Sequence, residues 1–448
     1  MAKTATEEPK AAPYTGPSRE AVLEERNKYV LPGTMLYYKD PLLISRGKLQ
    51  YVFDEKGRKY LDGFAGVVTV SVGHCHPTIV ERAQAQMESL WHTTTLYLYP
   101  HLGRFAKKLI ERVKPANPDL DVCFFTNSGT EATELATTIA KNYTGRQEFI
   151  ALRHSFHGRS LMAMTLTGQS PWRHSTPYAW GVNHAPANYT YRRPEGTTPK
   201  QYAEWCADEV EEIVKYSTCG KIAGFLAEPI SGNGGVITPE PEYFPRVHEI
   251  VKKYGGLYIT DEVQAGMGRT GNDFLGIQKW GVKPDMVTMA KGLGNGFPLG
   301  AVIMTREVGE AMRDKIHFNT FGGNPIAMTV GEAVLDVLAD EKLPENAAVV
   351  GEHLKGRLAK LVDRYEVVGD VRGMGLMLGV ELVKDKKSKT PAPEIAAKVM
   401  EGMRAKGVLI GKGGQAGNTL RIKPPLCVTK EDADLIFETM DASLKEVA

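Results

Sequence analysis

Cysteine is scarce in this chain, and its arrangement argues against a disulfide framework. The 448 residues contain five cysteines, an odd number, scattered without a C-x-x-C motif. We therefore expect a reducing compartment. Long apolar runs are also absent, since no stretch approaches the roughly 18 residues of a membrane-spanning helix. The net charge of +2 gives no reason to expect nucleic acid or an anionic membrane as a partner.

The N-terminal segment lacks the features of a targeting signal. Residues 1–18 contain no apolar signal core, and Glu7 and Glu8 argue against an arginine-rich transit peptide. We expect a short disordered tail here and a cytoplasmic protein. The rest of the chain shows no internal repeat.

Short β-rich runs alternate with longer amphipathic stretches between about residues 121 and 304. The runs are DVCFFT, EFIAL, IAGFLAE, GLYIT, DMVTMA and GAVIM. Strands spaced by helices predict an α/β fold with a mostly parallel sheet covered on both faces. After the tail at 1–18, we expect a large domain at 71–335. A small α+β domain is expected from both chain ends, 19–70 and 336–448.

Two of the expected strands end in residues that suit one kind of cofactor chemistry. Lys291 follows DMVTMA, and Asp261 ends LYITD. Ligands in open α/β sheets bind beyond the carboxyl ends of the strands. An amine and a carboxylate there suit pyridoxal phosphate: the lysine forms a Schiff base with its aldehyde, and the acid keeps its pyridine nitrogen protonated. Asp261 alone is equally compatible with a structural role, whereas the small and apolar neighbours of Lys291 favour a functional one.

Other strand ends carry residues suited to hold such a cofactor. The NSGT turn at 127–130 opens a helix, and its backbone N–H groups suit a phosphate, although such a turn is also a common helix cap. Phe156 offers a flat face for an aromatic ring, although a lone phenylalanine more often belongs to a core. His157 also fits a structural hydrogen bond. Glu228 suits either a nearby cation or a loop cap.

Two later segments add polar groups. Thr320 lies in the loop HFNTFGGNP, where its hydroxyl suits a phosphate. Arg421 ends a strand-like run before Pro424 and Pro425. An arginine fork is a bidentate partner for a substrate carboxylate, and a surface salt bridge is the alternative.

The GHCHP segment contains three potential metal ligands in a row. His74, Cys75 and His76 alternate too closely to wrap one ion, and no second ligand cluster is evident. We expect a structural turn and no metal site.

Together these motifs resemble one known family. They are NSGTEA, FHGRS, AEPI, TDEVQAGMGRTG, AKGLGNGFPLGA, NTFGGNP and LRIKPPL. In this order and spacing they are similar to the class III aminotransferases of the fold-type-I pyridoxal phosphate enzymes, from about Tyr37 to the C-terminal region. The resemblance implies pyridoxal 5'-phosphate as cofactor and a ping-pong transfer of an amino group to an α-keto acid. It also implies a homodimer, or a dimer of dimers, with active sites at the subunit interface.

The resemblance assigns roles to individual residues. It implies Lys291 as the catalytic Schiff-base lysine and Asp261 as the partner of the pyridine nitrogen. Arg421 would bind the substrate α-carboxylate, and Glu228 would partner Arg421 when the substrate has none. Thr320 would reach the phosphate from the other subunit. The remaining cofactor contacts are implied for Ser128, Gly129 and Thr130 at the phosphate, Phe156 and Val263 at the ring faces, Gln264 at the ring 3-oxygen, and His157.

Within the family, FAGVVTVSVGHCHP and LWHTTTLYLYP are most similar to the alanine–glyoxylate type 2 branch and related pyruvate-dependent ω-aminotransferases. Val67 stands where ornithine-type enzymes are expected to have a tyrosine. Arg159 departs from the alanine–glyoxylate pattern and resembles the arginine that holds the carboxylate of an ω-amino acid in 4-aminobutyrate-type enzymes. Trp91, Tyr97 and Tyr99 are pocket candidates, although such an aromatic cluster more often belongs to a core. We expect alanine, a β- or ω-amino acid, or an amine as donor and pyruvate or glyoxylate as acceptor.

Other functions stay open. A 4-aminobutyrate- or ornithine-type aminotransferase would use 2-oxoglutarate. A racemase or aminomutase of the same fold would need no keto acid, and a decarboxylase would release carbon dioxide. A non-catalytic binding module is disfavoured because Lys291 and Asp261 are both present.

Overall fold

The computed structural model describes residues 13–447, and its largest element is a seven-stranded sheet. The strand order is β4-β10-β9-β8-β7-β5-β6. Neighbours from β9 to β6 pair in parallel, whereas β10 is antiparallel to both of its neighbours. The predicted α/β fold with a mostly parallel sheet is confirmed. The strands are β4 (Leu120–Thr126), β5 (Phe149–Leu152), β6 (Val182–Ala185), β7 (Gly224–Ala227), β8 (Leu257–Asp261), β9 (Met286–Met289) and β10 (Gly300–Thr305).

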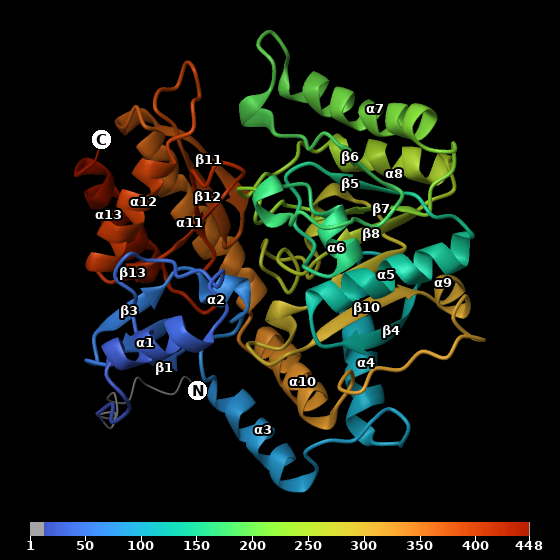
Figure 1. The fold of residues 1–448 in the computed structure, drawn as a ribbon, viewed down its shortest axis with the longest axis horizontal. Coiled ribbons are helices and arrows are strands. Elements are labelled where there is room, and N and C mark those ends of the chain that lie inside the picture. Colours follow the sequence, from blue (N-terminus) through green and yellow to red (C-terminus); the bar gives the residue numbers. More distant parts are fainter. Residues whose placement is uncertain (1–12, 448) are drawn as a thin grey trace.

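Helices cover both faces of this sheet, as the alternation within β5 shows. Phe149 and Ala151 pack into one apolar cluster, and Ile150 and Leu152 pack into another. Because side chains alternate across a strand, these clusters lie on opposite faces. One face carries α5 (Gly129–Thr144), α6 (Leu161–Leu166) and α9 (Arg306–Glu310). The other carries α4 (Pro100–Val113), α7 (Pro199–Ser217), α8 (Tyr243–Lys253) and α10 (Pro325–Asp340), with α3 (Pro77–Ser89) packed on α10 (Figure 1).

The two ends of the chain meet beside the large sheet. In Figure 1 the blue N-terminal elements lie against the red C-terminal ones, and β3 (Lys59–Asp62) pairs in parallel with β13 (Val408–Leu409). Two four-stranded sheets result, β1-β2-β3-β13 and β11-β12-β15-β14. The other strands are β1 (Ile44–Lys48), β2 (Tyr51–Asp54), β11 (Val368–Met374), β12 (Met377–Leu382), β14 (Gly411–Gly413) and β15 (Thr419–Ile422). The helices here are α1 (Arg19–Tyr29), α2 (Ala65–Val68), α11 (Leu343–Arg364), α12 (Pro393–Ala405) and α13 (Lys430–Lys445).

The N-terminal residues, the apolar character of the helices and the state of the cysteines bear on the expected tail, membrane association and disulfides. Of the expected disordered tail, residues 1–12 lie outside the described part of the chain, and residues 13–18 precede α1. Among the helices of residues 13–447, none combines the length and the apolar character that crossing a bilayer requires. All five cysteines lie within the described residues, and all are free thiols. The predicted domain limits stay predictions.

Candidate active site

The carboxyl ends of the parallel strands open into a cavity of about 350 Å³. Asp261 ends β8, Glu228 directly follows β7, and Lys291 follows β9 after Ala290. Because parallel strands end at one edge of a sheet, residues far apart in the sequence meet there. The predicted residues that line the cavity are Ser128, Gly129, Thr130, Phe156, His157, Asp261, Val263 and Lys291.

The N-terminus of α5 forms one wall of this cavity. Ser128 caps the helix by accepting a backbone N–H at 3.3 Å, and Gly129 begins it. A Cβ at Gly129 would lie 3.2 Å from Cγ1 of Val263, so glycine keeps this wall open. A helix N-terminus presents N–H groups without intrahelical partners and a partial positive charge. This wall therefore suits a phosphate group.

Asp261 is buried against His157 beside the cavity. Its Oδ2 lies 2.7 Å from Nδ1 of His157, and its Oδ1 accepts the N–H of Val263 at 3.1 Å. The buried Nε2 of His157 has no hydrogen-bond partner among the described residues. Burying a carboxylate is costly unless its oxygens are hydrogen-bonded or meet a cation. The pair thus presents a fixed carboxylate to a cationic group in the cavity.

Lys291 lies in a strained turn at the edge of the cavity. Its φ of +46° falls in the left-handed region, which a residue with a side chain adopts only when the surrounding structure imposes it. Burial lowers the pKa of Lys291, and the charge of Arg421 acts in the same direction, whereas Asp261 and Glu228 oppose the shift. A lowered pKa increases the fraction of neutral amine, which is the nucleophilic form.

Arg421 is buried in β15 without a carboxylate partner. Its guanidinium forms no ion pair within residues 13–447, and its Nε has no hydrogen-bond partner there. The ring of Phe64 lies 5.1 Å from the guanidinium carbon. The guanidinium instead donates to Oδ1 of Asn233 at 3.1 Å, the hydroxyl of Tyr37 at 3.1 Å and the carbonyl of Gly232 at 3.4 Å. A buried cation held only by neutral groups is suited to an anionic ligand.

Glu228 is also buried, and it contacts Phe156, Gly232 and Gln264. One carboxylate oxygen accepts the N–H of Phe156 at 3.0 Å, and the other accepts the N–H of Gly232 at 2.8 Å. Nε2 of Gln264 donates to that second oxygen at 3.4 Å. Burial raises the pKa of Glu228, the charge of Asp261 adds to the shift, and His157 opposes it.

Three polar residues around Arg421 and Gln264 were not predicted from the sequence: Lys423, Tyr37 and Asn233. Lys423 is fully buried, and its Nζ donates to Oε1 of Gln264 at 2.9 Å. The signal for Lys423 was its spacing of two from Arg421, which places both side chains on one face of an extended segment. Tyr37 and Asn233 carry no such local signal, because they reach Arg421 only through the tertiary fold.

Four predicted residues are exposed at the surface: Thr320, Arg159, Val67 and Trp91. None of them lines the cavity. Nη2 of Arg159 lies 3.0 Å from Nε2 of His174. Their predicted roles stay predictions.

The two histidines of GHCHP face different carboxylates. Nε2 of His74 lies 2.8 Å from Asp62, and Nε2 of His76 lies 2.9 Å from Glu341. Each imidazole therefore forms a separate hydrogen bond with its own carboxylate. Within residues 13–447, no group of three or more His, Cys, Asp or Glu side chains is arranged to hold a metal ion.

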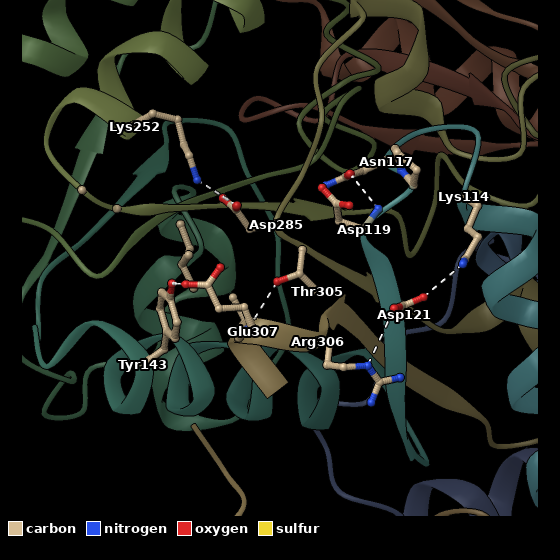
Figure 2. Close-up of a pocket in the computed structure, with 15 residues that line it drawn as sticks. Lys114, Asn117, Asp119, Asp121, Tyr143, Lys252, Asp285, Thr305, Arg306 and Glu307 are labelled. Atoms are coloured by element: carbon tan, nitrogen blue, oxygen red, sulfur yellow. Dashed lines mark hydrogen bonds and ion pairs between the residues drawn. The ribbon is translucent and has the colours of Figure 1, made fainter. Parts of the chain in front are cut away.

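A larger cavity of about 630 Å³ lies at the opposite edge of the same sheet, near the start of β8. Figure 2 shows that Lys252 points toward Asp285, and that Lys114 and Arg306 point toward Asp121. Lys252 pairs with Asp285 at 2.8 Å, and Lys114 pairs with Asp121 at 3.0 Å. Paired charges of this kind leave little capacity for a ligand, so the chemistry favours the cavity at the carboxyl ends.

Comparison with known proteins agrees with this geometry. Residues 36–444 match the family model described as aminotransferase class-III. The chain is 48% identical over 435 residues to the mitochondrial alanine–glyoxylate aminotransferase 2 homolog 2 of Arabidopsis thaliana, covering 97% of this chain and 89% of that protein. It is 39% identical to the mitochondrial alanine–glyoxylate aminotransferase 2 of Homo sapiens, covering 95% and 86%. A PLP-bound amine transaminase from an uncultivated Pseudomonas species superposes with a TM-score of 0.88 at 31% identity, covering 94% and 99%.

Proposed function

The chain belongs to the class III aminotransferases, whose cofactor is pyridoxal phosphate, and we propose that it moves an amino group from alanine, a β- or ω-amino acid, or an amine to pyruvate or glyoxylate. One observation carries the proposal: Lys291 and Asp261 line one cavity at the carboxyl edge of the large sheet, and Arg421 on β15, which lacks a carboxylate partner in the described residues, lies close enough for its charge to act on Lys291. The relatives named alanine–glyoxylate aminotransferase 2 support this substrate class.

The residues at the cavity fit the cofactor. The α5 N-terminus at Ser128–Thr130 would hold the phosphate, and Asp261, oriented by His157, would bond the pyridine nitrogen. Phe156 and Val263 line the cavity and would contact the ring faces. The amide of Gln264 would donate to the ring oxygen. When bound, the cofactor supplies an aldehyde carbon that carries the amino group between the two halves of a ping-pong reaction, and a ring that accepts electrons.

Lys291 is proposed as the residue that attaches the cofactor and moves the substrate proton. Its lowered pKa keeps part of the amine neutral, and neutral amine is both nucleophile and base. Lys291 would take the proton from the substrate Cα and deliver it to the aldehyde carbon of the cofactor, which is joined to Cα through the amino nitrogen. Both transfers use the same Nζ, so one side chain serves as base and then as acid.

Arg421 is proposed to bind the carboxylate of an amino or keto acid. Its neutral partners leave its charge available, and a bidentate pair with a carboxylate would fix the substrate orientation. Glu228 would pair with Arg421 when an amine lacks that carboxylate. Arg159, Trp91 and Val67 remain proposed for the other end of the substrate.

A homodimer is part of the proposal. Two adjacent segments expose apolar side chains: Leu96, Tyr97 and Leu98 in one, and Ile316, Phe318 and Phe321 in the other. The rings of His92 and Phe321 lie 5.7 Å apart, which places the segments side by side. Exposed apolar patches of this kind favour association. Thr320 lies in the second segment and would reach the phosphate at the partner's site.

The cytoplasm is the proposed location. Five free thiols are compatible with a reducing compartment. The relatives from Arabidopsis thaliana and Homo sapiens are named mitochondrial, so the mitochondrial matrix is the alternative. Fluorescence microscopy of the full-length chain tagged at its C-terminus distinguishes the two.

A half-reaction screen tests the proposed function. The cofactor-loaded protein is mixed with one donor at a time and no keto acid, and the cofactor absorbance is followed with the released product. We expect alanine and β- or ω-amino acids to give about one product per active site, with turnover resuming when pyruvate or glyoxylate is added. Continuous conversion of the donor without acceptor would instead identify a racemase or aminomutase. A clear preference for ornithine or 4-aminobutyrate with 2-oxoglutarate would contradict the proposed substrates.

A further inference from the structure

Lys423 is a fully buried lysine without an acidic partner in its hydrogen bonds. None of its surface is exposed, and it ranks among the largest buried side chains. Its Nζ donates to the carbonyl of Gly232 at 3.1 Å and to Oε1 of Gln264 at 2.9 Å. Within residues 13–447 it forms no ion pair. Burying an ammonium against neutral acceptors is costly, so the position calls for a physical reason.

The ammonium group selects one orientation of the Gln264 amide. Lysine in its charged form has three donors and no acceptor, so the amide turns its oxygen toward it. The amide NH₂ must then point away from Lys423, and its Nε2 lies 3.4 Å from Oε2 of Glu228. With a neutral apolar side chain in place of Lys423, the contact with Glu228 would be the remaining polar constraint on the Gln264 side-chain amide.

Gly232 links Lys423 to the other groups of the site. Its N–H donates to Glu228 at 2.8 Å, and its carbonyl accepts from both Lys423 and Arg421. A Cβ at Gly232 would lie 2.5 Å from Oε1 of Gln264, so the peptide packs directly on that amide. The amide is therefore held by one glycine peptide and oriented by one cation.

We propose that Lys423 is a positioning residue that holds the Gln264 amide with its NH₂ group toward Glu228 and the ring oxygen of the cofactor. This inference rests on the proposed function, because Gln264 is there assigned to the ring oxygen. Lys423 acts through Gln264 and contacts neither substrate nor reacting atoms. Lys423 would keep the NH₂ group of Gln264 facing the ring oxygen of the cofactor. The amide oxygen in that place would repel the ring oxygen, because both are acceptors.

The charges around Lys423 bear on the orientation. Burial lowers the pKa of Lys423, and Arg421, Lys291 and Arg269 act in the same direction, whereas Glu228 opposes them. The charged amine only donates, and the neutral amine also accepts. The selection of one amide orientation is consequently strongest at low pH and weakens as the amine loses its proton.

A double-mutant cycle read by absorbance tests the role. The cofactor spectrum is titrated with pH in the wild type, Lys423→Met, Gln264→Ala and the double variant. Loss of a hydrogen-bond donor to the ring oxygen raises the pH at which the spectrum is half converted. We expect each single variant to raise this midpoint by about one pH unit. In the Gln264→Ala background, Lys423→Met is expected to add less than half of its own shift. Equal shifts in both backgrounds would overturn the inference.

Lys423→Arg supplies a second test if Lys423→Met fails to fold. Arginine keeps a donor-only cation, so its midpoint is expected to stay near that of the wild type. A shift as large as that of Gln264→Ala would overturn the positioning role. Thermal unfolding of the cofactor-free variants verifies their folding. A spectrum without any pH-dependent band in the wild type would overturn the proposed function itself, and this inference with it.

Discussion

The Nδ1 atom of His157 lies 2.7 Å from Oδ2 of Asp261, and both side chains are buried. His157 follows β5 and Asp261 ends β8, and β7 lies between these two strands in the sheet. A histidine at this distance fixes the direction of the carboxylate and gives it a hydrogen-bond partner inside the protein. The other oxygen of Asp261 accepts the N–H of Val263, so rotation of the carboxylate is blocked at both ends.

This fixed carboxylate predicts a strong effect of Asp261→Asn. An amide cannot hold a proton on the pyridine nitrogen, so we expect turnover to fall by at least about 100-fold. The cofactor should still bind through the phosphate site. Steady-state kinetics and cofactor titration measure the two effects. Asp363→Asn, the same change at an exposed position on α11, is the control and should leave both unchanged.

Arg421→Ala should separate substrates by their carboxylate. We expect kcat/KM for alanine to fall by roughly 10- to 100-fold, because a charge-assisted bidentate pair is lost. An arylalkyl amine without a carboxylate should be converted at close to the wild-type rate. Arg421→Lys retains the charge without the fork and should give an intermediate loss. Equal losses for both substrate types would contradict the assigned role.

The exposed apolar segments predict that dimerisation and cofactor binding are linked. Leu98→Glu together with Phe318→Glu should convert the dimer to a monomer in analytical ultracentrifugation, since charges would be buried in the interface. Because Thr320 would then be withdrawn from the neighbouring phosphate site, cofactor affinity should fall in parallel. Tyr216→Glu, at an exposed position on α7, is the matched control. A monomeric wild type would disprove the proposed assembly.

Glu262 predicts a pH-dependent stability. Burial raises its pKa from 4.5 to about 7, and hydrogen bonds from the N–H groups of Ile277 and Gly276 oppose the shift. The folded protein keeps this proton up to about pH 7, whereas the unfolded chain releases it near pH 4.5. The free energy of unfolding should therefore decrease by roughly 3 kcal/mol as the pH rises through this window.

Denaturant unfolding of the wild type and Glu262→Gln between pH 4.5 and 8 measures that slope. Glutamine does not titrate, so its stability relative to the wild type should rise with pH. A constant difference between the two proteins would show that Glu262 keeps its ordinary pKa.

The fold was predictable because its determinants are local. Each predicted run of β-forming residues, such as GLYIT and DMVTMA, lies on a strand of the large sheet, and amphipathic helices cover both faces. The predicted resemblance to the class III aminotransferases and their alanine–glyoxylate type 2 branch is also confirmed by the relatives.

The gathering of Asp261, Glu228 and Lys291 followed from one topological rule, that parallel strands end at one edge. The contacts of Arg421 with Tyr37 and of Lys423 with Gln264 did not, because they join segments hundreds of residues apart or depend on side-chain packing. No periodic pattern in the sequence indicates such pairs. The sequence also did not indicate that Thr320 is exposed in a single chain, because its proposed contact with a phosphate requires a second copy of the chain.

The identity of the lysine that attaches the cofactor tests the central claim most directly. The cofactor-loaded protein is reduced with borohydride, digested and examined by mass spectrometry. We predict that the cofactor mass is found on the peptide containing Lys291, and that Lys291→Ala binds cofactor without covalent attachment and loses nearly all turnover. Attachment to another lysine, such as the buried Lys423, or full activity of Lys291→Ala would contradict the assignment.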